Sequence, residues 1–246
     1  MGRYFGTIIT VAFMLVPCGS SRAAEGDAKG ILDKAIKALG GEEKLGKVEA
    51  FTWKSKGTAN FNGNESEFKN QLTVKGLDHY RREFGNDQFT GIVVLAGDKG
   101  WRKFGDNMTE LEGDGIANEK RNLYLQVIPT TLVALKDKGF KYEAAGEEKV
   151  GDKPAVILKV TGPDGKDFKL FFDKESGLPV RLTATVVFRD QESELETNFA
   201  EYKDFDGIKK ATKLDVKRNG ETFQNAEVTE FKVLEKVDPE TFTEPK

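Results

Sequence analysis

The chain has 246 residues, of which 38% are hydrophobic and 32% are charged, and this composition is typical of a soluble globular protein. It carries 41 Asp and Glu against 38 Lys and Arg, a formal net charge of −3, and the two signs alternate without a long basic run. Because phosphate binding needs a concentrated positive patch, we expect no nucleic-acid partner. No linker or low-complexity segment divides residues 24–246, which we predict to form a single domain.

The N-terminal segment differs in composition from the rest of the chain. Arg3 precedes an uncharged apolar run over residues 4–16, and Ser21 and Ala23 are small residues at the two positions that a signal peptidase reads. The pattern predicts a signal peptide over residues 1–23 and therefore a periplasmic or secreted protein. The apolar run is shorter than the roughly 20 residues that a spanning helix needs, so we expect no membrane span in the mature chain.

Cys18 is the single cysteine, which excludes an intrachain disulfide. It follows the sequence LVP, and bacterial lipoprotein signals end in a similar box, although Pro17 matches that box poorly. Two outcomes stay open. Acylation of Cys18 would tether the protein to a membrane, whereas cleavage after Ala23 would remove its only thiol.

The first element after this segment is a predicted amphipathic helix over residues 27–39. Its apolar residues recur at helical spacing and form one stripe, made of Ile31, Leu32, Ala35, Ile36 and Leu39. Asp27 can cap the start, and Gly40 and Gly41 end the helix. The residues EEKLGKV (42–48) then predict a short second helical turn.

From Phe51 onward the hydrophobic period changes to two, which predicts strands separated by tight turns such as those at residues 62–64 and 85–87. Links this short favour an antiparallel meander. Residues 113–138 return to helical spacing, and Pro129 is expected to split them into two short helices between the two halves of the sheet. Strands resume after residue 139, and Asn219-Gly220 is a strong hairpin signal. Roughly a dozen long strands must curl, so the predicted fold class is mainly β (α+β), with one large curved antiparallel sheet.

Residues with catalytic chemistry are scarce. His79 is the single histidine, and its charged neighbours favour a surface position over a catalytic role. Acidic pairs such as those in residues 110–114 and 192–196 are typical of solvated strand faces. Residues 204–207 (DFDG) resemble part of a calcium loop, but Ile208 and Lys210 break that pattern, so a turn at Gly207 is the better interpretation. We therefore expect no enzyme activity, no metal site and no cofactor.

Aromatic residues are the more informative feature, since the chain contains 18 Phe. They fit either an ordinary packed core or a partly open apolar cavity, and a core residue and a cavity-lining residue have the same chemistry. The sequence leaves both open. The candidate ligand-binding residues are Trp53, Phe68, Phe89 and Trp101 on the strands, and Leu123, Leu132 and Leu135 on the helical segment that would cover them.

Two later segments, GKDFKLFFDKESGLPVRLTATV (165–186) and YKDFDGIKKATKLDVKR (202–218), resemble the outer-membrane lipoprotein-sorting, LolA-like family. The matching residues are Phe172, Asp173, Gly177, Leu178, Pro179, Asp206, Gly207, Ile208, Lys209 and Thr212, and Ala211 stands where that family often has proline. The resemblance implies an incomplete β-barrel whose concave face is covered by helices and binds acyl chains or hydrophobic partners. The family's carrier has an arginine inside its cavity, and Arg81, Arg82 and Arg102 are candidates here without a matching motif.

Two functional hypotheses follow. The first is an exported, non-enzymatic carrier or binding protein for lipid, lipoprotein acyl chains or another hydrophobic small molecule in the cell envelope. The alternative is an envelope protein-interaction or sensing module on the same scaffold with a closed core, which would bind a protein partner.

Overall fold

The computed structural model describes residues 21–61, 63–137, 139–188 and 191–246. Cys18 and nearly all of the predicted signal peptide lie outside these residues. The strands are β1 (Ala50–Phe61), β2 (Asn64–Lys75), β3 (His79–Gly85), β4 (Thr90–Ala96), β5 (Lys99–Phe104), β6 (Asn107–Glu110), β7 (Lys141–Val150), β8 (Lys153–Thr161), β9 (Asp167–Asp173), β10 (Pro179–Phe188), β11 (Gln191–Phe205), β12 (Ile208–Arg218) and β13 (Glu221–Val233). The helices are α1 (Ser21–Leu39), α2 (Glu42–Leu45) and α3 (Asp114–Thr131), with short 3-10 helices η1 (Val133–Lys136) and η2 (Pro239–Phe242).

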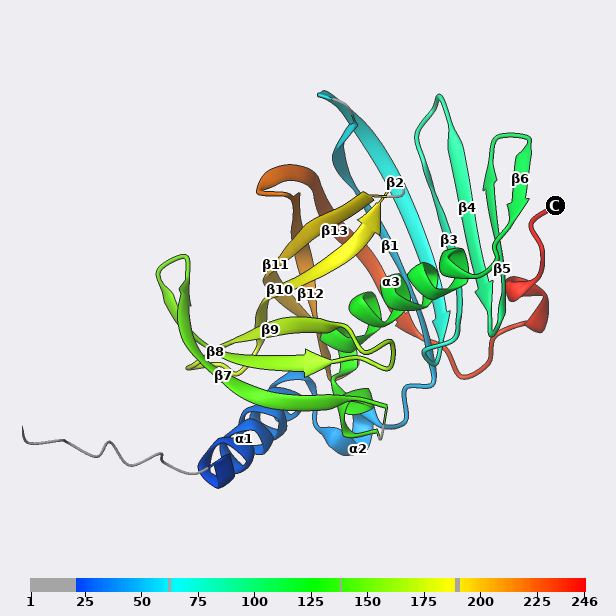
Figure 1. Ribbon diagram of the computed structural model, residues 1–246. Coiled ribbons are helices and arrows are strands. Elements are labelled where there is room, and N and C mark those ends of the chain that lie inside the picture. Colours follow the sequence, from blue (N-terminus) through cyan, green and yellow to red (C-terminus); the bar gives the residue numbers. More distant parts are fainter. Residues whose placement is uncertain (1–20, 62, 138, 189–190) are drawn as a thin grey trace, which may run out of the picture.

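All thirteen strands form one antiparallel sheet in the order β6-β5-β4-β3-β2-β1-β13-β12-β11-β10-β9-β8-β7. The first and last strands therefore meet in the middle, where Trp53 of β1 pairs with Phe231 of β13. The two edge strands, β6 and β7, are consecutive in the chain but lie at opposite ends of the sheet. The segment between them, which contains α3, must cross the sheet to connect its two edges (Figure 1). The predicted curved antiparallel meander with inserted helices is confirmed.

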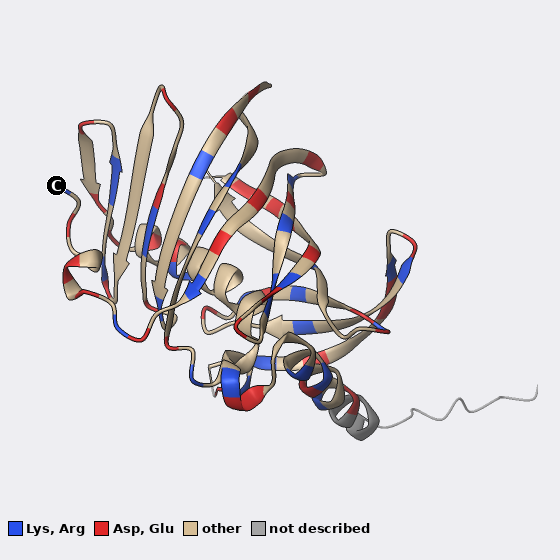
Figure 2. Cartoon of the chain, turned by 180° about the vertical axis from the view of Figure 1, so that it is seen from behind, with Lys and Arg blue, Asp and Glu red and all other residues tan. Residues whose placement is uncertain are grey.

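One face of the sheet carries α3, and the opposite face is largely bare. Figure 2 shows the sheet from behind, with Lys and Arg and Asp and Glu residues distributed along its strands. Strand side chains alternate between the two faces, so the register assigns each residue to one of them. We call the face on which α3 lies the inner face and the opposite one the outer face.

Two helix predictions need correction. The N-terminal helix begins at Ser21 rather than Asp27, so the predicted cleavage point after Ala23 falls in its first turn. Residues 114–131 form one helix, because Pro129 lies in the last turn, where its missing N–H affects only one hydrogen bond near the end. The helix ends two residues later at Thr131, and the next residue, Leu132, has a left-handed φ of 60°.

The main core cluster joins the helices to the sheet, and two smaller clusters of buried residues lie apart from it on the strands. The predicted apolar stripe of α1 packs into it through Leu32, Ala35, Ile36 and Leu39, while Ile31 lies at its edge. The helical segment contributes Leu123 and Leu132, which are fully buried against the sheet. None of the described helices is both long and apolar enough to cross a membrane.

The predicted turns have the backbone conformations that their sequences require. Asn219 and Gly220 both have positive φ, 49° and 82°, as a two-residue hairpin demands. In the DFDG segment, Gly207 has φ 80°, and its N–H donates to the Asp204 carboxylate at 2.7 Å. The turn predicted at Gly207 is therefore confirmed.

Candidate functional site

Two residues near the middle of α3 fasten the helix to opposite halves of the sheet. Glu119 is buried and accepts hydrogen bonds from the Tyr80 hydroxyl on β3 and from Arg102 Nη2 on β5, the latter at 2.7 Å. Desolvation, with the adjacent Glu119 charge, raises the pKa of Tyr80 well above its ordinary value, so the phenol stays a neutral donor. The first anchor of α3 is thus the Glu119 carboxylate, which accepts hydrogen bonds from a phenol and a guanidinium on two strands.

Arg121 provides the second anchor, on the other half of the sheet. Its Nε donates to the Thr185 carbonyl of β10 at 2.8 Å, and its Nη2 donates to the Asp167 carbonyl of β9 at 2.9 Å. Its Nη1 donates to the Tyr124 hydroxyl and forms an ion pair with Asp164 at 2.9 Å. Because Glu119 binds strands of one half of the sheet and Arg121 binds strands of the other, α3 connects the two halves through side-chain hydrogen bonds.

Beneath the last turn of α3 lies an unusual buried lysine. Lys210 of β12 is only 6% exposed, and its Nζ donates to the Thr130 hydroxyl at 2.8 Å. The same atom lies 4.3 Å from the centre of the Trp53 ring, a cation–π distance. Desolvation lowers the pKa of Lys210 to about 7.

The inner face continues beyond α3, where it is less well covered. On β3 the inward side chains change from buried Tyr80 to half-buried Arg82 and Phe84, and on β12 from buried Thr212 to half-buried Leu214. We call this region the uncovered inner face. Its half-buried or exposed members are Asn70, Arg82, Phe84, Phe104, Phe188, Leu214, Val216, Arg218 and Phe223, and the buried residues Ser55 and Phe68 lie among them.

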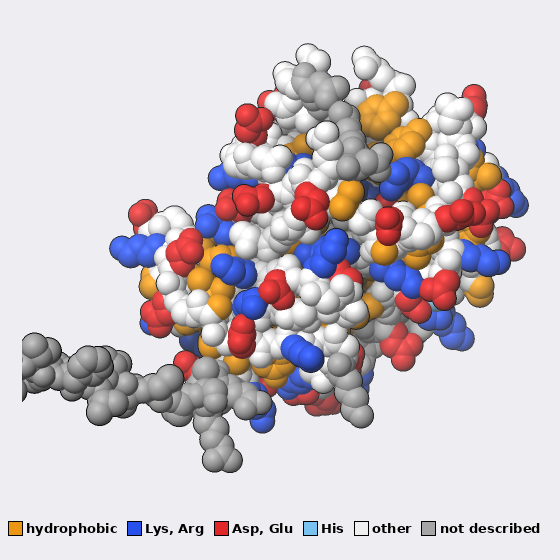
Figure 3. All heavy atoms as spheres, viewed as in Figure 1, with side chains coloured by type: hydrophobic (Ala, Val, Ile, Leu, Met, Phe, Trp, Pro, Cys, Tyr) orange, Lys and Arg blue, Asp and Glu red, His pale blue; other side chains and the backbone are white. Residues whose placement is uncertain are grey.

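Aromatic rings form a cluster on the β3–β5 side of the uncovered inner face. The Phe84 ring lies 5.9 Å from Phe104 and 6.4 Å from Phe89, in edge-to-face arrangements. Phe104 and Phe89 are 45% and 38% exposed, and Figure 3 shows hydrophobic side chains at the surface near the strand tips at the top of the molecule. Gly91 leaves room for the cluster, since a Cβ there would lie 2.6 Å from the Phe84 ring. The exposed parts of the Phe104 and Phe89 rings therefore belong to the apolar surface of the molecule.

A second aromatic group lies on the opposite wall. Phe188 of β10 and Phe223 of β13 have ring centres 5.7 Å apart. The Arg218 guanidinium lies 3.4 Å from the first ring centre and 3.8 Å from the second. Both walls of the uncovered inner face are thus lined with rings.

The seven residues predicted as ligand-binding candidates separate into three groups. Trp53, Leu123, Leu132 and Leu135 come together in the packed core beneath α3. Phe68 is on the uncovered inner face, and Phe89 belongs to the aromatic cluster beside it. Trp101 lies on the outer face, because its neighbours Gly100 and Arg102 point inward.

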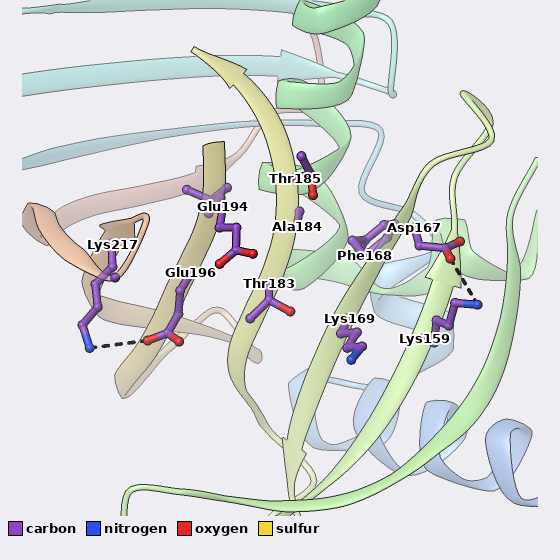
Figure 4. Close-up of a pocket in the computed structure, with 12 residues that line it drawn as sticks. Lys159, Asp167, Phe168, Lys169, Thr183, Ala184, Thr185, Glu194, Glu196 and Lys217 are labelled. Atoms are coloured by element: carbon purple, nitrogen blue, oxygen red, sulfur yellow. Dashed lines mark ion pairs between the residues drawn. The ribbon is translucent and has the colours of Figure 1, made fainter. Parts of the chain in front are cut away.

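Two hollows of about 500 and 800 Å³ were found, and the lining side chains assign both to the outer face. Figure 4 shows the smaller one, whose charged side chains point away from α3 and α1. It is lined by three lysines and three acids, which include the ion pairs Lys217–Glu196 and Lys159–Asp167 at 3.5 and 3.1 Å. The larger one has three lysines and four acids. With their charges nearly balanced, neither favours an apolar or a charged ligand.

His79 and the three candidate arginines lie on two different faces of the sheet. His79 lies on the outer face near the C-terminus, hydrogen-bonded to Asp78 at 2.7 Å and 5.5 Å from the Phe242 ring. Arg81 also points outward and pairs with Glu83 at 2.6 Å. Arg82 and Arg102 point inward, so the sequence could have separated them from Arg81 by alternation along the strand.

The two anchors of α3 and the buried lysine were not predicted from the sequence. Lys210 had a signal, because period-two alternation puts it on the same face as Ile208 and Thr212, which are both buried. The anchors had none, since the partners of Glu119 and Arg121 are up to 64 residues away in the chain. The described residues hold no group of three or more His, Cys, Asp and Glu side chains arranged to bind a metal ion.

An unclosed antiparallel sheet with a helix across its inner face defines a half-barrel. Three solved structures share it. One is a LolA superfamily protein from Nitrosomonas europaea (TM-score 0.59, 14% identity, 88% of this chain and 97% of that chain). The others are a DUF1329 family protein from Desulfovibrio piger (0.57, 14%, 88% and 97%) and a domain classed with the outer membrane lipoprotein-sorting proteins from Vibrio parahaemolyticus (0.53, 10%, 86% and 97%).

The chain therefore has the LolA-like fold, as its turn motifs indicated. At these low identities the likeness shows the fold alone. The sequence matches no known family model, and no curated protein matches it.

Proposed function

We propose that this chain is an exported, non-enzymatic carrier or binding protein for a lipid, a lipoprotein acyl chain or another hydrophobic ligand. The ligand would lie on the uncovered inner face. The strongest support is the change from buried to half-buried inward side chains along β3 and β12, at the part of the sheet that α3 no longer covers. Export is supported by the signal-peptide pattern of residues 1–23, which also favours a periplasmic or secreted location.

The energetics of an alkyl chain fit such a surface. Burial of each CH₂ group is worth roughly 0.8 kcal/mol, so a twelve-carbon chain contributes on the order of 10 kcal/mol before ordering costs. The rings of Phe84 and Phe104 present an apolar surface that would shield the chain from water. A non-enzymatic role is supported by the placement of His79, which lies on the opposite face of the sheet.

The packed core beneath α3 favours the alternative, a protein-interaction module with a closed interior. Leu123, Leu132 and Leu135 are buried in the main core cluster, so a ligand cannot enter there without moving α3. If this alternative is correct, the protein binds no alkyl probe and binds a protein partner instead. One binding experiment with an alkyl probe therefore distinguishes the two functions.

Phe104 and Met108 form a matched pair for that experiment. They are exposed to similar extents, 45% and 43%, but Phe104 points to the inner face and Met108 to the outer face. Phe104→Glu should weaken binding of an uncharged fluorescent dodecyl probe at least tenfold, because it puts a charge against the alkyl chain. Met108→Glu should leave the dissociation constant unchanged. Equal effects of both variants, or no binding by the unmodified protein, would refute the proposed site.

A further inference from the structure

Arg82 differs from the other inward-facing charges on the β3–β5 side of the inner face. Among the described residues it makes one hydrogen bond, from Nε to Asn70 Oδ1 at 2.8 Å. Its neighbour Arg102 pairs with Glu119, whereas no carboxylate of the described residues lies within ion-pair distance of Arg82. The terminal nitrogens Nη1 and Nη2 of Arg82 therefore keep donor capacity for another molecule.

The local charge count also leaves a positive excess. Arg82 and Arg102 share one nearby carboxylate, Glu119, and the Tyr80 phenol between them is neutral. The cluster thus carries one net positive charge. Desolvation lowers the pKa of Arg82, as expected for a cation whose charge is incompletely compensated.

The side chain of Arg82 is held in place from two sides. Asn70 on β2 accepts its Nε hydrogen and donates onward to Ser55 Oγ on β1 at 3.4 Å. The guanidinium lies 4.7 Å from the centre of the Phe84 ring. A polar row across three strands therefore ends at a cation that borders the aromatic cluster.

We propose that the uncovered inner face binds amphiphiles with an anionic head group, carboxylate or phosphate, which accepts hydrogen bonds from Nη1 and Nη2 of Arg82 while the alkyl chain lies against Phe84 and Phe104. This inference rests on the proposed function and adds a specificity to it. A planar guanidinium binds such oxyanions with two parallel hydrogen bonds. The aromatic cluster would provide affinity for the alkyl chain, and Arg82 would select the head group.

A series of twelve-carbon ligands tests this in the purified protein by titration calorimetry, below their micellar concentrations. Laurate, dodecyl phosphate, dodecanol and dodecyltrimethylammonium share the chain and differ in the head group. We expect laurate or dodecyl phosphate to bind about tenfold to hundredfold more tightly than dodecanol, and the cation to bind most weakly. A preference for one anion over the other identifies carboxylate or phosphate as the natural head group.

Arg82→Gln should abolish this preference and leave dodecanol binding unchanged. Arg81→Gln is the matched control, because it removes the same charge from the adjacent residue on the outer face, and it should keep the preference. A folded Arg82→Gln protein that still prefers laurate would overturn the inference. If that variant does not fold, Arg82→Lys keeps the charge but cannot donate two parallel hydrogen bonds, so it should weaken the preference for the anionic ligands. An undiminished preference in folded Arg82→Lys would overturn the bidentate contact.

The ligand series on the unmodified protein separates the two proposals. Equal binding of dodecanol and laurate would overturn the head-group inference and leave the hydrophobic site intact. Binding of none of the four ligands would overturn both. Tightest binding of dodecyltrimethylammonium would also overturn the role of Arg82.

Discussion

The ammonium group of Lys210 contacts the Trp53 ring and the Thr130 hydroxyl, and it forms no ion pair with a carboxylate of the described residues. A buried charge without a counter-ion is costly, so folding favours the neutral amine. Its pKa of about 7 in the folded protein lies well below the ordinary 10.5. The unfolded chain therefore binds a proton that the folded protein releases between these two values.

This linkage predicts the pH dependence of stability that Lys210 contributes. Between pH 7 and 10.5 the unfolded state holds more protons, so the free energy of unfolding rises with pH, and the penalty is fully present below pH 7. The shift corresponds to at most about 5 kcal/mol. Lys210→Met should therefore raise the free energy of unfolding at pH 6 by several kcal/mol, with a gain that shrinks toward pH 10, as measured by urea unfolding.

Lys209→Met is the control, because Lys209 is the exposed neighbour that points outward, and it should change stability by less than about 0.5 kcal/mol. The measurements should stop below pH 10, since buried tyrosines such as Tyr80 and Tyr202 have raised pKa values and reduce stability above that point. A gain from Lys210→Met that is the same at pH 6 and pH 9.5 would contradict the assignment of a titrating buried amine.

At the level of elements, α3 is held by polar contacts as much as by its apolar side. Arg121 donates hydrogen bonds to two strand carbonyls, a phenol and a carboxylate, and it is almost fully buried. Removal of one partner from a buried network leaves the other polar groups without hydrogen bonds, which costs more than the network itself contributes. The attachment of α3 to this half of the sheet should therefore depend strongly on Arg121.

Arg121→Met should lower the free energy of unfolding by about 2–4 kcal/mol and speed hydrogen exchange in α3. The matched control is Lys120→Met, one residue earlier. Lys120 is partly exposed, and its ion pair with Asp98 spans 2.6 Å on the surface, where such pairs contribute about 0.5 kcal/mol. If Arg121→Met destabilises no more than Lys120→Met, the second anchor does not hold the helix.

The elements themselves were largely predictable, and α3 shows where prediction stopped. Helical spacing located residues 113–138 as helical, because an amphipathic face leaves a periodic signal in one stretch of sequence. The position of Pro129 relative to the helix end was not predictable, since that end depends on the left-handed residue Leu132 and on packing. The anchors were hidden for the same reason: a Glu and an Arg on a helix are normally solvated, and only the fold brings Tyr80 to Glu119.

The candidate site was predictable in chemistry but not in position. Aromatic residues spread over the strands fitted either a packed core or an open apolar cavity, and the structure places Phe68 and Phe89 at or beside the uncovered inner face. The sequence could not show which part of that face α3 covers, so Trp53 and Leu123 were placed in the same group as Phe89 although they are buried in the core. The part of the inner face that is covered depends on where α3, a helix of 18 residues, crosses the sheet, and this is a property of the whole molecule.

At the scale of the whole molecule, the two halves of the sheet are joined by a single strand pair, β1 with β13. Gly57 of β1 lies in this pair opposite Ala226, next to Ala59. A Cβ at Gly57 would lie 1.8 Å from the Asn225 carbonyl oxygen and 2.9 Å from the Ala226 Cα. These small residues let the two central strands approach closely, while the large Phe68 side chain packs over them from β2.

Gly57→Ala should therefore destabilise the protein by about 3 kcal/mol or more, because the contact is with backbone atoms that can move only if the central strand pair shifts. Gly30→Ala in α1 is the control. A Cβ there meets nothing within 4 Å, and alanine favours a helix over glycine by up to about 1 kcal/mol, so this variant should be slightly more stable. Urea unfolding of both variants measures the two signs in one experiment. A Gly57→Ala protein within 1 kcal/mol of the unmodified one would mean that the β1–β13 pair can spread without cost, and that the curvature of the half-barrel is set elsewhere in the sheet.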